Sequence, residues 1–245
     1  MEMRRRVFRD TALFSYVALI LTLGAGLILW GWVRADASAA PFSLAVFGFW
    51  FVMSLAAECF WLETPTGAGM VSMSLAVNMA TFFTLPFEQV LMVGAFSVAL
   101  SDVLIHRRGG LRACFNGAQT AISMAASLGV FQLLGGPSYP TGSQVFLQHP
   151  LPVLTAPVIF FVVNTFLVAA VISLYSDLPL WRVWRENYGF SYQFLSSGTL
   201  FLLGVSLVIA TESIGWVSGL LYLLLFYFVR DGYRRFVRDR ARKPA

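Results

Sequence analysis

Charged residues are scarce in this chain: Asp, Glu, Lys and Arg make up 12% of its 245 residues. Because soluble domains carry about 25% charged residues, the composition excludes an ordinary soluble domain. Hydrophobic residues instead reach 58%, and no stretch is left over for a separate soluble unit. The sequence therefore predicts one integral membrane domain over residues 1–245, with a basic N-terminus at 1–10 and a basic tail at 231–245.

Catalytic and metal-binding motifs are also missing. The chain has no H-E-x-x-H, no G-x-S-x-G and no G-x-x-x-x-G-K, which are the patterns of zinc proteases, hydrolases and P-loop enzymes. His106 and His149 fall on opposite predicted sides of the membrane, so they are not expected to share a metal. Cys59 and Cys114 fit two small buried hydrophobes better than a disulfide. We therefore expect no enzymatic activity, no metal and no cofactor.

The charge that is present follows a pattern. Sixteen of the 17 Lys and Arg residues fall into four blocks, at residues 4–9, 107–112, 182–185 and 230–243. Apolar spans lie between these blocks, and alternate loops carry the basic residues, so the positive-inside rule places the blocks and both termini in the cytoplasm. For a basic protein of this kind we expect anionic lipid head groups, and not nucleic acid, as partners.

Eight apolar segments are candidate membrane helices, which predicts an all-α polytopic bundle. Their ranges are 11–33, 42–62, 71–85, 87–105, 112–134, 151–175, 192–210 and 214–230. The third is short for a hydrocarbon core of roughly 30 Å and is joined to the fourth at Pro86. It is counted as a crossing because an even number of crossings must separate the first two basic blocks. Residues 135–150 fit the longest external loop, with little helix of its own.

The segment 112–134 is the most informative of the eight. Small residues recur at every fourth position, namely Ala113, Gly117, Ala121, Ala125 and Gly129. This ladder lets a neighbouring membrane helix approach closely, so we expect the segment to lie at the centre of the bundle. Phe115 is expected among its few residues that face lipid.

Polar residues form a stripe beside this ladder, and polar residues of other spans could meet it. The candidate ligand-binding residues are Asn116, Gln119, Thr120, Ser123, Asn78, Ser74, Glu58 and Asn164. The stripe either lines a polar cavity or bonds to backbone and neighbouring helices as packing. Glu58 needs a partner, water or a proton inside an apolar run, unless its position one turn from the helix end lets it reach water. Asp102 and His106, beside two arginines, fit a charge cluster that anchors a helix end at the membrane surface.

Two motifs carry a resemblance to known proteins: V-S-x-S at residues 71–74 and F-N-x-A-Q at residues 115–119. With the Pro86 break between them, residues 45–136 resemble an uncharacterised bacterial multi-pass module that precedes HD-type phosphohydrolase or GGDEF diguanylate cyclase outputs in other proteins. The short hairpin and small-residue helix are more loosely similar to the S components of energy-coupling-factor vitamin transporters. The resemblance implies the bacterial cytoplasmic membrane. The chain ends at Ala245, where an output would begin, so a sensor would need a separate signalling or transporter partner.

Two functions therefore stay open. The chain is expected to be a sensor or transport component that binds a small ligand in an intramembrane polar cavity. The alternative is a non-catalytic structural or assembly subunit that packs against other membrane proteins. The two diverge on Asn116→Leu, which removes the ligand from an intact fold in the first case and destabilises the bundle in the second.

Overall fold

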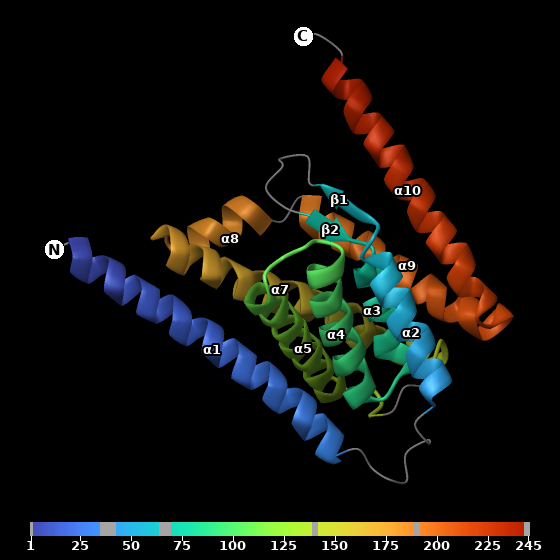
Figure 1. Cartoon of the computed structure of the whole chain (residues 1–245). Coiled ribbons are helices and arrows are strands. Elements are labelled where there is room, and N and C mark those ends of the chain that lie inside the picture. Colours follow the sequence, from blue (N-terminus) through green and yellow to red (C-terminus); the bar gives the residue numbers. More distant parts are fainter. Residues whose placement is uncertain (1, 35–42, 64–69, 139–141, 189–191, 243–245) are drawn as a thin grey trace.

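The computed structural model describes residues 2–34, 43–63, 70–138, 142–188 and 192–242, and it is almost entirely helical (Figure 1). In chain order the elements are α1 Glu2–Arg34, α2 Leu44–Ala57, β1 Trp61–Glu63, β2 Met70–Ser72, α3 Ser74–Thr84, α4 Phe87–Leu104, α5 Gly110–Leu133, α6 Gln144–Gln148, α7 Pro150–Ser176, α8 Leu180–Tyr188, α9 Tyr192–Ile214 and α10 Val217–Arg242. The predicted all-α fold class is confirmed. Residues 139–141 of the predicted external loop and residues 243–245 of the tail lie outside the described ranges.

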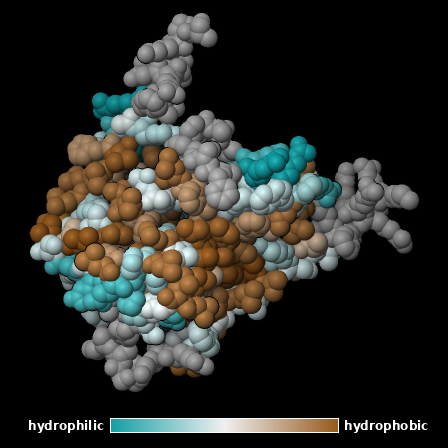
Figure 2. All heavy atoms as spheres, turned by 180° about the vertical axis from the view of Figure 1, so that it is seen from behind, coloured by the Kyte–Doolittle hydropathy of each residue, from teal (hydrophilic) through white to brown (hydrophobic). Residues whose placement is uncertain are grey.

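Four helical stretches are long and apolar enough to cross a membrane: Asp10–Val33, Phe87–Leu104, Pro150–Ser176 and Phe194–Ile214. Two further apolar helices, α2 and α3, are shorter than 18 residues. Large apolar side chains also cover much of the outside of the molecule (Figure 2), and Phe14, Leu202 and Phe228 are 64–70% exposed. Water does not favour such a surface but lipid does, so the structure indicates a helical membrane protein.

The basic segments gather at one end of the bundle. Figure 1 shows the N-terminus, the connection from α4 to α5, the helix α8 and the last turns of α10 on the same side of the molecule. We call this side the basic end. The junction of α3 with α4, the helix α6 and the turn from α9 to α10 lie at the opposite end (Figure 1). The eight helices other than α6 and α8 thus alternate in direction along the chain.

The predicted central position of the fifth segment is confirmed, because α5 contacts α4, α7 and α1. Gly117 faces α4 so closely that a Cβ atom there would lie 2.6 Å from the carbonyl oxygen of Ala95. The expectation that Phe115 faces lipid was wrong. Its side chain is 7% exposed and packs beside Tyr16 and Ile20 of α1, with the Tyr16 ring centroid 6.4 Å away. The ladder predicted one packed face of α5 but gave no sign of this second one.

The third apolar segment is a short helix, as predicted, and it is even shorter than the predicted range of 71–85. The helix α3 has 11 residues, of which nine are buried, and it contacts α2, α4 and α9. Eleven residues rise only about 16 Å, so protein around the helix must replace lipid at its ends. The break at Pro86 is confirmed, since α3 ends at Thr84 and α4 begins at Phe87.

Some boundaries were wrong. Helix was expected up to Leu62 and again from Val71, but these residues pair as an antiparallel ribbon in which Leu62 lies opposite Val71. Residues 180–188, expected in a loop, form the amphipathic helix α8.

Cys59 and Cys114 are free and exposed. Cys59 follows the end of α2 and Cys114 lies on the outer side of α5, so neither is buried.

Candidate functional site

Polar and charged side chains from four helices meet at the basic end of the bundle. We call them the ionisable cluster: Glu58, Ser74, Asp102, His106, Arg108 and Asn116. Their positions follow from the helix boundaries. Glu58 caps the carboxyl end of α2, Ser74 begins α3, Asp102 and His106 lie at the end of α4, and Asn116 lies in the second turn of α5. The cluster divides into two halves, one around each carboxylate.

The half around Glu58 is incompletely bonded. The Ser74 hydroxyl donates a hydrogen bond to Oε1 of Glu58. Glu58 is buried, with 7% of its surface exposed. The other carboxylate oxygen, Oε2, lies 3.9 Å from Nε2 of His106. This separation is longer than a hydrogen bond, although a protonated imidazole would still be attracted. Oε2 and Nε2 therefore face each other without a direct hydrogen bond between them.

The half around Asp102 is fully bonded. Asp102 is 2% exposed, and its Oδ1 accepts from the Arg108 guanidinium at 2.7 Å. Its Oδ2 accepts from the side-chain amide of Asn116, which joins α4 to α5. Arg107 between them takes a left-handed backbone conformation with φ of 52°, and the turn brings Arg108 back over the end of α4. This half therefore fastens the α4–α5 connection.

The ribbon of β1 and β2 lies beside the Glu58 half. The Trp61 ring of β1 approaches the His106 ring edge-to-face at 6.4 Å between centroids. The guanidinium of Arg234, on α10, lies 5.6 Å above the centroid of the same Trp61 ring. Trp61 thus connects the ionisable cluster with α10.

The remaining candidate residues of the sequence analysis have partners elsewhere. Asn78 accepts from Ser54 of α2 at 2.8 Å, and Ser54 in turn bonds Ser97 of α4 at 2.8 Å. The Gln119 amide donates to the Asn164 side chain of α7 at 2.8 Å. The last two bond to carbonyls of their own helix, Thr120 to Asn116 and Ser123 to Gln119.

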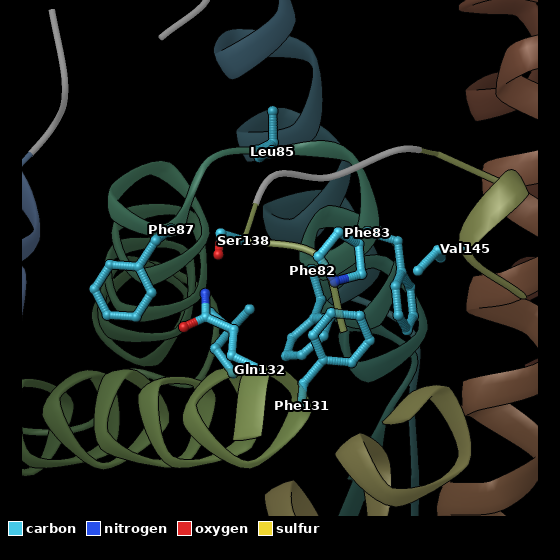
Figure 3. A pocket seen from close by; sticks show the side chains of 10 residues that line it. Phe82, Phe83, Leu85, Phe87, Phe131, Gln132, Ser138 and Val145 are labelled. Carbon is cyan, nitrogen blue, oxygen red and sulfur yellow. The ribbon is translucent and has the colours of Figure 1, made fainter. Parts of the chain in front are cut away.

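The structure therefore does not bring the eight candidate residues to one shared space. Asn116 faces α4, Asn78 faces α2, and Gln119 faces α7, each with a bonded partner. The pocket in Figure 3 lies instead at the opposite end of the bundle, where α3, α4 and α5 meet. Its empty volume of about 360 Å³ includes open solvent, and the pocket is lined mainly by apolar residues, among them Phe82, Phe87 and Phe131. None of the eight candidates lines it.

Sequence reasoning underestimated three residues of the cluster. Asp102, His106 and Arg108 were interpreted as a surface anchor, yet Asp102 is buried and His106 faces Glu58. The signal was present, because the spacing of Asp102 and His106 places both on one face of α4. What was missing was the turn at Arg107 and the end of α2 at Ala57, which bring the partners together.

Two other polar contacts have no clear sequence signal. The Glu212 carboxylate of α9 accepts from the backbone N–H and the hydroxyl of Ser143, which ties α9 to the start of α6. The Trp184 indole of α8 donates to the Thr165 hydroxyl of α7 at 2.9 Å. Burial against the bundle raises the pKa of Tyr188, at the end of α8, to about 12, so its hydroxyl stays neutral at physiological pH.

Within the described ranges there is no group of three or more His, Cys, Asp or Glu side chains that could hold a metal ion. Comparisons with protein-family models, with curated proteins and with solved structures found no match for this chain.

Proposed function

We propose that this chain is a non-catalytic sensor or transport component that binds a small polar ligand at the Glu58 half of the ionisable cluster. The observation that carries the proposal is the 3.9 Å separation of Glu58 Oε2 and His106 Nε2. Since hydrogen bonds span about 2.7–3.2 Å, one atom placed to the side of the line that joins them could bond to both. A buried ionisable group is costly unless it is paired or hydrogen-bonded, so an incompletely bonded pair such as this one supports the same function.

The position of the pair also indicates the ligand's chemistry and approach. The side chains of His106 and Glu58 are 12% and 9% exposed, so a small part of each remains open at the surface of the chain. A carboxylate accepts hydrogen bonds, and a neutral imidazole can donate or accept one. A hydroxyl or amine group of a small molecule matches this pair. Of the eight candidates from the sequence, Glu58 and Ser74 keep this role, and the bonds of the other six favour packing.

The alternative, an assembly subunit, loses part of its support in the structure. The small-residue ladder of α5 and the G-x-x-x-G pair of Gly215 and Gly219 are the faces on which another membrane protein could pack. Gly117 instead contacts α4, and a Cβ atom on Gly219 would lie 2.8 Å from Phe49 of α2. Both close approaches are thus used within the chain. We retain a separate signalling or transporter protein as partner, as the resemblance implies.

Ligand retention tests the proposal. Native mass spectrometry of the gently extracted protein should detect a small polar molecule on the wild type. Glu58→Gln and His106→Gln should lose it, because each removes one of the two groups that face the gap. Ser127→Ala is the matched control: Ser127 is also buried, but it bonds the Ala156 carbonyl of α7 away from the cluster. A wild type that retains no small molecule, and that no polar metabolite stabilises, would contradict the proposal.

We further propose the bacterial cytoplasmic membrane, with eight crossings and both termini in the cytoplasm. The gathering of the basic blocks at one end supports this orientation by the positive-inside rule. The amphipathic helix α8, with exposed Trp181 and Arg182, supports contact with anionic head groups at that surface.

Reporter fusions check the proposed orientation. Fusions at Gly110 and Ala245 should give a cytoplasmic signal, and a fusion at Gly142 should give a periplasmic one. Gly110 lies within the second basic block, whereas Gly142 comes two residues before α6, which lies at the opposite end of the bundle (Figure 1). A periplasmic signal at Gly110 or Ala245 would refute the topology.

A further inference from the structure

One buried donor in the described part of the chain has no hydrogen-bond partner: Nε of Arg230, on α10. An unbonded buried donor is costly, and the cost is larger for a charged group than for a neutral one. An ordered water, an ion or another molecule outside the chain commonly bonds to such a group, and a cationic guanidinium favours an anion. Arg230 therefore points to a binding site for an anion.

The surroundings of Arg230 form the rest of this site. Phe226, Arg230 and Arg234 follow one another at intervals of four residues, so they share one face of α10. Phe226 is fully buried, which shows that this face is turned toward the bundle. Arg234 lies over Trp61 of β1. Stacking leaves the edge donors of its guanidinium available, so the two arginines present donors to the same side of α10.

The position of Arg230 along α10 indicates which kind of anion binds there. Residues 217–229 carry no charge, and Arg230 is the first charged residue that follows them. Arg230 thus lies where an apolar membrane helix reaches the head-group region, near the interfacial Trp61. One turn before Arg230, the Tyr227 side chain is 50% exposed, which provides an apolar surface beside the arginine for an acyl chain. Phosphate accepts two parallel hydrogen bonds from a guanidinium.

We propose that Arg230 and Arg234 bind the phosphate of an anionic lipid in the angle between α10 and β1. This site lies on α10 and does not depend on a ligand at the Glu58 half of the cluster. It is more specific than a general attraction of basic loops to lipid, because it predicts that particular arginines hold one lipid molecule. The chemistry would equally suit free phosphate, so the test must separate the two sources.

The test uses the full chain, purified in detergent, stripped of lipid and titrated with phosphatidylglycerol under native mass spectrometry. Arg230→Gln and Arg234→Gln should weaken binding of the first lipid about tenfold or more, since each removes charge-assisted hydrogen bonds. Arg235→Gln is the matched control, because the Arg235 side chain is 75% exposed and pairs with Asp231 on its own helix. It should bind the first lipid as the wild type does. Equal weakening in all three variants would overturn the proposal.

Thermal melts of the same proteins provide the second arm. Without lipid, Arg230→Gln should melt at or above the wild-type temperature, because it removes a buried N–H donor that has no hydrogen-bond partner. Phosphatidylglycerol should raise the melting temperature of the wild type more than that of Arg230→Gln. If inorganic phosphate produces this difference and the lipid does not, the lipid is not the occupant. If neither produces it, no anion site exists at Arg230.

Discussion

Replacing Gly117 by alanine is expected to destabilise the protein more than any other single methyl group added to α5. The new Cβ atom would lie 2.6 Å from the Ala95 carbonyl oxygen and 3.1 Å from the Ala99 Cβ, both on α4. Backbone atoms cannot turn aside as a flexible side chain can, so α4 and α5 must move apart. Overpacking of this kind costs about 1–3 kcal/mol, and Gly117→Leu should cost more. The melting temperature in detergent measures the loss.

The matched control is Gly129, on the same helix. A Cβ atom there would have no heavy atom within 4 Å. Gly129→Ala should therefore be neutral or stabilise the helix by up to about 1 kcal/mol, because alanine is the better helix former. Phe115→Leu is unsuitable as a lipid-facing control, since Phe115 packs against α1. If Gly117→Ala and Gly129→Ala melt at the same temperature, the close contact between α4 and α5 is absent.

The fold was predictable where one physical signal dominated. The composition and the long apolar runs predicted a helical membrane protein, and the ladder around Gly117 predicted the centre of the bundle. The limits appear where two signals compete. Trp61 and Val71 are apolar enough to extend the neighbouring helices, yet they lie in a two-stranded ribbon. Pairing between two segments depends on how the chain turns between them, which apolar character does not reveal.

The candidate site was harder to predict because a hydrogen bond depends on which neighbour a side chain points toward, and not only on whether that side chain is buried. The polar stripe on α5 was identified correctly, but its members bond to different neighbours. The Thr120 hydroxyl donates to a backbone carbonyl of its own helix, whereas the Gln119 amide donates to the Asn164 side chain of α7. Which neighbour lies on which side of α5 is a property of the packed bundle. The phenylalanine-lined pocket had no polar periodicity to mark it, and it went unnoticed for that reason.

The second large effect is expected at Asp102. Asp102→Ala removes the carboxylate that holds the Arg108 guanidinium at 2.7 Å and accepts from the Asn116 amide. Breaking one side of a buried ion pair costs about 3–5 kcal/mol, because the remaining charge loses its partner and stays away from water. The Arg108 side chain is 21% exposed and can recover some solvation, so we expect the lower part of that range. Asn116→Leu removes only one hydrogen bond, from an amide to the charged carboxylate, and should cost about 1.5–3 kcal/mol.

A double-mutant cycle isolates the ion pair from the loss of side-chain volume. Arg108→Ala in the Asp102→Ala background should cost much less than Arg108→Ala alone, because the arginine no longer has a partner to lose. The control pair is Arg182 with Glu186 on α8, whose side chains are 60% and 50% exposed at a similar distance of 2.9 Å. Exposed pairs of this kind contribute about 0.3–0.5 kcal/mol, so Glu186→Ala should hardly change the melting temperature. Additive effects of Asp102→Ala and Arg108→Ala would mean that the pair contributes nothing to the α4–α5 connection.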